Sequence, residues 1–291
     1  MSPAKISSPV SLETIRMLES KSILHRRTLL KLIYAAKAGH TGGSLSCVDI
    51  LNVLYNCVMN ITPNNFSEVN RDHYIHSKGH SVEALYAVLA EKGFFPFELL
   101  DSVEKYGSDF IGHPTRSVPG IEQNTGALGH GLSLAVGMAI AAKKNGYNHR
   151  VFTVMGDGEL TEGSIWEASA SAAHYQLDNL VAIIDRNTLQ ISGRTESVMN
   201  MEPLEEKFSA FGYAVRKVDG NNIPALVSIF ENLPFENGKP NLILANTVKG
   251  KGISFMEDKV QWHHRVPTEA EYATALLELE NAEKALEKSN E

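Results

Sequence analysis

Short apolar runs recur through the second half of the chain, and stretches with helical spacing of apolar residues separate them. The runs lie at residues 150–155, 180–184, 213–218 and 241–245. The intervening helical stretches lie at residues 164–175, 203–211 and 223–233. Strands that are apolar on both faces and alternate with helices predict an α/β fold, in which helices cover both faces of a parallel sheet. Ligands of such sheets bind beyond the carboxyl ends of the strands.

The first half of the chain is predicted to be mainly helical. The expected helices are residues 11–38, a helix that begins with Ser46 as its N-cap, residues 81–92 and residues 131–144. The first of them is expected to stop at Gly39. The last segment is rich in Glu, Ala, Leu and Lys, and predicts a solvent-facing helix with a frayed end. We therefore expect one domain over residues 1–267 and a C-terminal helical tail over residues 268–291.

Composition excludes several classes of protein. The 291 residues carry a formal net charge of −7, which gives no reason to expect nucleic acid or an anionic membrane as a partner. No apolar run approaches the roughly 20 residues of a membrane-spanning helix, and the N-terminus lacks the apolar part of a secretory signal. Cys47 and Cys57 fall in one predicted helix about 15 Å apart, which is too far for a disulfide. These features predict a cytoplasmic protein.

A glycine-rich turn follows the first apolar run directly. Gly156, Asp157 and Gly158 come immediately after Met155. Glycines permit tight backbone geometry and let main-chain N–H groups face an anion. An aspartate between them would repel a phosphate unless a cation lay between the two. The turn therefore indicates a diphosphate bridged by Mg²⁺, a hard ion that takes oxygen ligands in octahedral geometry.

The second apolar run ends in another polar group, Asp185-Arg186-Asn187. Because adjacent parallel strands end at the same edge of a sheet, Asp157 and Asn187 are expected to emerge side by side. One carboxylate, one amide oxygen and one backbone carbonyl would form half of an octahedron. Diphosphate oxygens and water would complete it.

Residues 156–187 resemble the thiamine diphosphate-binding motif, which begins with GDG and ends near an Asn about thirty residues later. Proteins with this motif usually have Asn or Asp before that final Asn, whereas this chain has Arg186. The resemblance implies the diphosphate-binding (PP) domain of the thiamine diphosphate-binding fold. It implies thiamine diphosphate as cofactor, held with Mg²⁺, or with Ca²⁺ or Mn²⁺ in its place.

Other segments narrow the resemblance to the transketolase family and span residues 11–266. They are Ala38-Gly-His-Thr-Gly-Gly43, Arg71-Asp72, Ser77-Lys-Gly-His80, Leu85-Tyr86, Gly112-His113-Pro114, Thr125-Gly-Ala-Leu-Gly-His-Gly131, Thr247-Val-Lys-Gly-Lys-Gly252 and Trp262-His263. Thr41, Ala127 and His130 replace residues that are usual in the family, and His130 is given no role.

The resemblance implies a role for individual residues. His40 and His113 would contact the reacting end of the substrate, and His80 and His263 would lie near the diphosphate. His264 competes with His263 for that position. The metal ligands would be Asp157, Asn187 and the carbonyl of Leu189, with Gly156 and Gly158 against the diphosphate. The backbone of Gly126 and Leu128 would line the aminopyrimidine ring. Glu162 would face the glutamate that activates this ring, across a subunit interface.

The activity implied is transfer of a two-carbon ketol unit from a ketose phosphate to an aldose phosphate, with pentose phosphates as the default substrates. The chain ends soon after the domain that binds the diphosphate. Family architecture therefore implies a separate pyrimidine-binding C-terminal subunit of about 300 residues and an α2β2 assembly.

Two alternatives remain at this point. One is the α subunit of a 2-oxo acid dehydrogenase, which uses the same metal motif. The other is a non-catalytic regulatory subunit that binds thiamine diphosphate.

Overall fold

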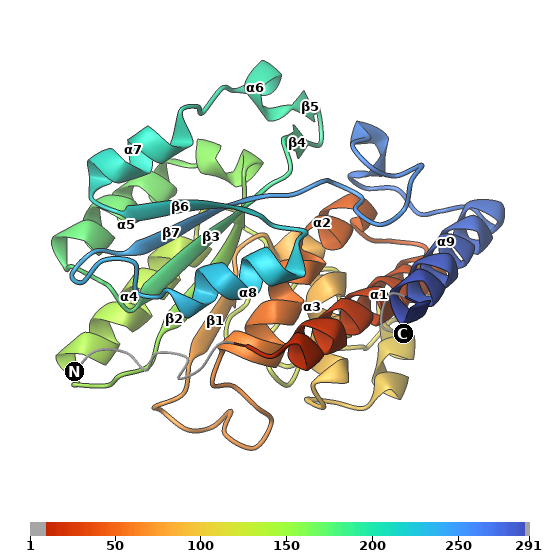
Figure 1. Ribbon diagram of the computed structural model, residues 1–291, viewed down its shortest axis with the longest axis horizontal. Helices are drawn as coiled ribbons and strands as arrows, with labels where there is room; N and C mark the ends of the chain where they lie inside the picture. Colours follow the sequence, from red (N-terminus) through yellow and green to blue (C-terminus); the bar gives the residue numbers. More distant parts are fainter. Residues whose placement is uncertain (1–9, 289–291) are drawn as a thin grey trace.

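The computed structural model describes residues 10–288 and is built around a five-stranded parallel sheet (Figure 1). In their order across the sheet the strands are β1 (His73–His76), β2 (Val151–Gly156), β3 (Leu180–Arg186), β7 (Asn241–Asn246) and β6 (Ala214–Asp219). All four pairings between neighbours are parallel. The predicted α/β class with a parallel sheet is confirmed.

Helices cover both faces of the sheet, because each central strand sends alternate side chains into two different cores. The first face packs against α1 (Leu12–Ala36), α2 (Thr41–Val53), α3 (Val82–Glu91) and α8 (Ile223–Glu231). The second face packs against α4 (Gly131–Lys144), α5 (Gly163–His174) and α7 (Leu204–Phe211). In β3, Val181 and Ile183 enter the first core, whereas Leu180, Ala182 and Ile184 enter the second.

The C-terminal helix α9 (Glu269–Lys288) lies along α1 (Figure 1). Tyr272 stacks on Tyr34 of α1, with ring centroids 4.3 Å apart. Ala275 and Leu279 are fully or almost fully buried in the first core. The helix predicted for this segment is present, and one face of it is seated on the domain. The frayed end expected for the tail falls on residues 289–291, outside the described residues.

Two helix boundaries differ from the sequence-based prediction. Helix α2 begins at Thr41, so Ser46 is an interior residue whose hydroxyl bonds to the Gly43 carbonyl and to Asp185. Helix α1 ends where Lys37 adopts a left-handed φ of 56°, before Gly39 is reached. Lys37 is thus the left-handed C-cap of α1, and the N-cap of α2 is His40, whose side chain makes no capping hydrogen bond.

Several short elements were not predicted from the sequence. They are strand β1, a π-helical turn (Leu54–Val58) that continues α2, the antiparallel pair β4 (Leu189–Gln190) and β5 (Gly193–Arg194), α6 (Thr195–Val198), and 3₁₀ turns at Gly79–Ser81, Phe97–Ser102, Gly158–Thr161 and Val260–Trp262. Strand β1 is only four residues long, and its histidines obscure the apolar pattern. Cys47 in α2 and Cys57 in the π-helical turn are both free thiols. Within residues 10–288, no helix combines the length and the apolar character needed to cross a membrane.

Candidate active site

The carboxyl ends of β2 and β3 bring the two predicted polar groups together. Gly156 in β2 is paired in register with Asp185 in β3, so Asp157 and Asn187 leave the sheet at the same edge. One oxygen of Asp157 accepts a hydrogen bond from the N–H of Gly158 at 2.9 Å. The other accepts from the N–H of Thr188 at 2.6 Å. This carboxylate therefore ties the turn after β2 to the turn after β3.

A cavity of about 310 Å³ opens at this edge of the sheet. Predicted site residues that line it are His40, His80, Gly126, Leu128, Gly156, Asp157, Gly158, Asn187, Leu189 and His263. Residues that line it without having been predicted are Lys78, Glu159, Gln190, Ile191 and Lys249. The cavity thus gathers most of the candidate residues from loops that are far apart in the sequence.

The oxygen donors at the end of β3 are held in fixed orientations. Asn187 donates through its amide nitrogen to Asp185 at 3.1 Å, and its amide oxygen accepts from the N–H of Leu189 at 3.2 Å. The Leu189 carbonyl accepts from the Lys249 ammonium at 2.8 Å. Within residues 10–288, no group of three or more His, Cys, Asp or Glu side chains could hold a metal by itself. The donor set of carboxylate, amide and carbonyl fits a hard cation whose remaining ligands come from a phosphate ligand and water.

Two charges that face this cavity lack a compensating partner at short range. Lys249 is 2% exposed, and burial together with the nearby Lys78 ammonium lowers the pKa of Lys249 to about 8. In the described part of the chain, no carboxylate oxygen lies within 4 Å of the Lys249 ammonium nitrogen, so Lys249 forms no ion pair there. Burial and the charge of Asp185 raise the pKa of Asp157 to about 6. A buried cation and a buried carboxylate of this kind fit a bound diphosphate with its metal ion, which would neutralise both.

Lys78 and Asp185 form a fully buried ion pair beneath the cavity. Asp185 also accepts hydrogen bonds from Ser46, Asn187 and Thr247. Burial opposes both charges, yet the pair raises the pKa of Lys78 and lowers the pKa of Asp185. Lys78 and Lys249 both lie in segments that carried the family resemblance. Neither lysine was predicted as a site residue, because an unpaired or buried charge becomes visible only when burial is known.

Five histidines meet above the lysines. The ring centroid of His40 lies 5.3 Å from that of His80, 6.3 Å from His113, 5.7 Å from His263 and 4.5 Å from His264. The His80 and His263 rings stack at 5.6 Å. Burial and the neighbouring His264 ring lower the pKa of His40 to about 4. Burial and Lys249 lower the pKa of His263 to about 3. The imidazoles of His40 and His263 are therefore neutral at neutral pH and can accept a hydrogen bond.

The geometry separates the two adjacent histidines near the C-terminal end of the site. His263 lines the cavity, and its Nδ1 lies 2.9 Å from the Lys249 ammonium. His264 instead packs against His40. His113 lies beside the cavity wall, where a Cβ on Gly126 would come within 2.8 Å of its ring. Gly126 has a φ of +140°, and a Cβ on Gly79 would lie 2.8 Å from the Gly126 nitrogen. The wall therefore depends on glycine at both positions.

Two buried glutamates that were not predicted from the sequence support the loops of the site. Glu159 accepts from the N–H groups of Gly129 and Gly156, and from the Ser77 hydroxyl. Glu83 accepts from the N–H of His40 at 3.1 Å, and burial raises the pKa of Glu83 to about 7. Each carboxylate thus fixes the backbone beside a residue that lines the cavity.

Glu162 and His130 do not line the cavity. Glu162 is exposed and stands at the N-terminus of α5, where its side chain packs against Gly129. His130 is exposed as well, and its Nδ1 lies 3.0 Å from the Leu128 carbonyl oxygen. An exposed Glu162 is compatible with the expectation that it faces a partner subunit.

Relatives with a similar length cover almost the whole chain. An apulose-4-phosphate transketolase subunit from Phocaeicola vulgatus is 48% identical over 276 residues, which are 95% of this chain and 98% of that protein. A 6-deoxy-6-sulfo-D-fructose transketolase subunit from a Clostridium species is 43% identical over 264 residues, covering 90% of this chain and 96% of that protein.

Larger transketolases match this chain over part of their length. The human transketolase is 39% identical over 230 residues, which are 79% of this chain and 36% of that protein. The structure of transketolase from Leishmania mexicana superposes with a TM-score of 0.79 at 28% identity, covering 93% of this chain and 46% of that one.

The transketolase from Campylobacter jejuni gives a TM-score of 0.79 at 26% identity, covering 96% of this chain and 48% of that one.

The family model described as "Transketolase, thiamine diphosphate binding domain" matches residues 19–278. This match confirms the resemblance seen in the sequence and favours it over the 2-oxo acid dehydrogenase alternative. The chain belongs to the transketolase family and corresponds to its N-terminal, thiamine diphosphate-binding domain.

Proposed function

We propose that the chain is the N-terminal subunit of a two-chain transketolase that depends on thiamine diphosphate and a divalent cation, Mg²⁺ by default. The proposed reaction is transfer of a two-carbon ketol unit from a ketose phosphate to an aldose phosphate. This proposal rests on the share of each relative's length that the chain matches. Relatives named as transketolase subunits are matched over 96–98% of their length, whereas the larger transketolases are matched over 36–48%.

In this proposal the cavity holds the diphosphate and its metal ion. Asp157, Asn187 and the Leu189 carbonyl would be the metal ligands, and Lys249, which donates to that carbonyl in this structure, would bind the diphosphate instead. Lys249 would neutralise part of the charge of the diphosphate, and the neutral ring of His263 would hydrogen-bond to it, with His80 beside them. The backbone at Gly156 and Gly158 would face the diphosphate. The backbone of Gly126 and Leu128 lines the aminopyrimidine ring.

Thiamine diphosphate, when bound, supplies the carbanion chemistry that breaks and forms the ketose carbon–carbon bond. The residues of this chain bind, orient and move protons. The imidazoles of His40 and His113 are placed to exchange protons with substrate hydroxyl groups. The lowered pKa of His40 keeps its ring neutral, so that it can accept a hydrogen bond. Glu162 is proposed to hydrogen-bond the activating glutamate of the partner.

The proposed assembly contains a second subunit of about 300 residues that supplies the pyrimidine site, in an α2β2 arrangement. A cytoplasmic location belongs to the same proposal, since both cysteines are free thiols. Pentose phosphates are the default substrates. The names of two relatives mention apulose 4-phosphate and 6-deoxy-6-sulfo-D-fructose, so a dedicated sugar belongs among the donors to be tested.

The decisive experiment co-expresses this chain with the candidate subunit encoded by an adjacent gene. Ketol transfer is then assayed with thiamine diphosphate and Mg²⁺, using a pentulose phosphate and apulose 4-phosphate as donors. Activity is expected from the pair and from neither chain alone. Activity of this chain alone would show that it does not lack half of its site. Copurification without transfer from any donor would favour the non-catalytic subunit.

The Glu162→Gln variant sharpens the test. It is expected to lower ketol transfer by the pair roughly 100-fold or more, because an amide cannot share a proton with the activating glutamate of the partner as a carboxyl group can. Its unfolding temperature should stay unchanged, since Glu162 is exposed. Glu167→Gln is the matched control, because Glu167 is an exposed glutamate in α5, the helix that Glu162 precedes as N-cap. Equal activity of both variants would remove Glu162 from the mechanism.

A further inference from the structure

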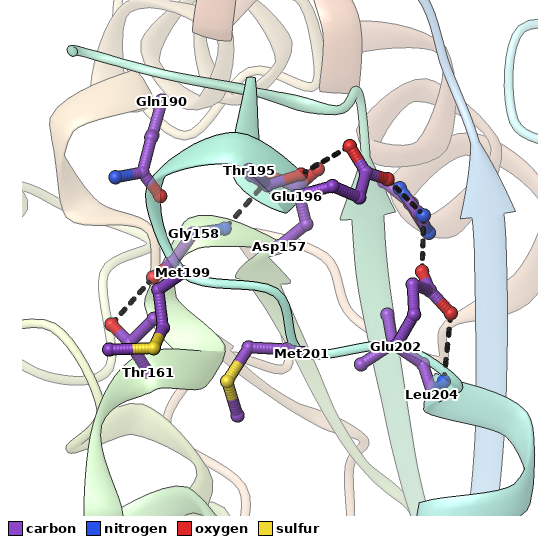
Figure 2. Close-up of a pocket in the computed structure, with 11 residues that line it drawn as sticks. Asp157, Gly158, Thr161, Gln190, Thr195, Glu196, Met199, Met201, Glu202 and Leu204 are labelled. Carbon is purple, nitrogen blue, oxygen red and sulfur yellow. Dashed lines mark hydrogen bonds and ion pairs between the residues drawn. The ribbon is translucent and has the colours of Figure 1, made fainter. Parts of the chain in front are cut away.

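Arg186 is the residue that departs from the thiamine diphosphate motif, and its side chain has a defined place. It is the last residue of β3, between the buried Asp185 and Asn187. Its guanidinium group pairs with Glu196 in α6 at 2.8 Å and with Glu202, which precedes α7. Arg186 also lines a small cavity together with Asp157 and Gly158 of the Gly-Asp-Gly turn. Figure 2 shows Glu196, Glu202 and Asp157 around this cavity.

The two glutamates belong to one excursion of the chain, residues 188–202, which we call the 188–202 segment. It begins at Thr188, whose carbonyl accepts from the N–H of Thr195 at 3.0 Å. It ends at Glu202, which also accepts from the N–H of Leu204 at 2.9 Å. Arg186, which lies just before the segment, therefore forms ion pairs with its middle and with its end.

The 188–202 segment carries part of the cofactor cavity. Leu189, Gln190 and Ile191 line that cavity. A Cβ on Gly158 would lie 3.2 Å from the Cβ of Gln190, so the segment rests directly on the Gly-Asp-Gly turn. A displacement of the segment would move the Leu189 carbonyl away from Asp157 and Asn187.

Other contacts to this segment lie mainly near its ends. The N–H of Thr188 donates to Asp157 at 2.6 Å, the Lys249 ammonium donates to the Leu189 carbonyl at 2.8 Å, and the Lys207 ammonium donates to the Met201 carbonyl at 2.8 Å. In the middle of the segment, Arg194 forms a half-exposed ion pair with Asp258 at 2.5 Å.

The β4–β5 ribbon consists of two residue pairs, and Ile191 and Met199 are 66% and 57% exposed. Closing a loop of this length costs conformational entropy that so little apolar burial offsets only in part. An arginine that bridges two carboxylates supplies directional contacts that a shorter asparagine or aspartate would not span.

We propose that Arg186 is a positioning residue that holds the 188–202 segment in place through its ion pairs with Glu196 and Glu202, which we call the clasp. The clasp would fix the Leu189 carbonyl beside Asp157 and Asn187 for metal binding. The metal-binding part of this inference rests on the proposed function. The clasp itself is a property of this chain alone.

Amide hydrogen exchange of the full chain without cofactor tests the clasp. Arg186→Gln is expected to speed exchange in residues 189–201 roughly tenfold, the equivalent of about 1.4 kcal/mol, while exchange in β2, β3 and β7 stays unchanged. The double variant Glu196→Gln with Glu202→Gln should match it, and Arg186→Lys should lie between, because one ammonium cannot span both carboxylates. Arg27→Gln is the control. Arg27 forms an ion pair of the same length, 2.8 Å, with Glu283, between α1 and α9. Unchanged exchange in residues 189–201 in both clasp variants would overturn the proposal.

A titration with Mn²⁺ in the presence of thiamine diphosphate tests the positioning role. Arg186→Gln is expected to weaken Mn²⁺ binding by about tenfold, with Arg186→Lys restoring part of it and Arg27→Gln leaving it unchanged. Faster exchange with unaltered Mn²⁺ affinity would show that the clasp does not position the ligand, and would overturn the positioning role. If the unaltered chain bound no Mn²⁺ even with its partner subunit, the proposed function and the positioning role would fall together. The exchange result would still decide the clasp.

Discussion

At the scale of single residues, the cavity combines charges that burial disfavours. Lys249 is almost fully buried with no ion-pair partner among the described residues, and Asp157 is buried beside the carboxylate of Asp185. A chain selected only for stability would not keep such groups. Their cost is understandable if a metal ion and a diphosphate neutralise them when bound.

The Lys249→Met variant tests this interpretation. The folded pKa of about 8 lies below the unfolded value of 10.5, so the cost of the ammonium grows as the pH falls from 10.5 and reaches its full size, about 3 kcal/mol, below about pH 8. Loss of its hydrogen bonds to Leu189 and His263 offsets part of the gain. We therefore expect the unfolding midpoint without cofactor at pH 7 to be unchanged or raised, while affinity for thiamine diphosphate with Mg²⁺ falls roughly 10- to 150-fold.

Differential scanning fluorimetry with and without both ligands measures the two effects together. Lys251→Met is the control, because Lys251 lies two residues away in the same loop and is half-exposed in an ion pair with Glu257. A large loss of stability without ligand, or undiminished ligand binding in Lys249→Met, would contradict the assigned role.

At the scale of elements, the C-terminal helix α9 shows how packing changes the meaning of a sequence pattern. Its composition predicts a solvent-facing helix, and most of its residues are exposed. Ala275 and Leu279 nevertheless enter the core beneath α1. The helix therefore contributes to the stability of the domain that carries His40 and Lys78.

The contribution of α9 is measurable with two leucines of the same helix. Leu279 is 1% exposed, and Leu279→Ala is expected to lower the free energy of unfolding by about 2–4 kcal/mol. Leu277 is 56% exposed, and Leu277→Ala should change it by less than about 0.5 kcal/mol. Urea unfolding measures both. Equal effects of the two substitutions would mean that α9 does not pack on α1 in solution.

At the scale of the whole molecule, buried titratable groups make stability depend on pH. Burial lowers the pKa of His40 to about 4, and of His76 and His263 to about 3. Because the unfolded chain binds these protons near pH 6.5, the contribution of each histidine is lost as the pH falls below 6.5. Burial raises the pKa of Glu83 to about 7 and of Asp157 to about 6, so these carboxyls act in the opposite direction.

The histidines outnumber the carboxyl groups, and no histidine shift is smaller than a carboxyl shift. We therefore expect the chain without cofactor to lose stability between pH 6.5 and about pH 4.5. His40→Asn should reduce the steepness by up to one proton, or about 1.4 kcal/mol per pH unit. Urea unfolding at a series of pH values measures this slope. Constant or rising stability toward pH 4.5 would contradict the expected balance.

The sequence alone determined four of the five strands of the sheet, the longer helices between them, and the edge at which the site lies. Fully buried parallel strands need apolar runs, and glycine next to aspartate at a strand end leaves few conformations, so Asp157 and Asn187 could be placed from pattern alone. The motifs also indicated the family. Strand β1 was missed, because four residues with two histidines carry no clear period.

Only the tertiary structure decided which charged groups matter around these residues. Three features depend on which residues far apart in the chain come together. They are the lack of an ion-pair partner for Lys249 among the described residues, the ion pair of Lys78 with Asp185, and the hydrogen bond from the N–H of His40 to Glu83. The same is true of Arg186, which pattern marks as an exception and packing identifies as a link to Glu196 and Glu202. A local pattern determines which backbone a segment can form, whereas the energy of a charge depends on its burial and partners, which exist only once the chain has folded.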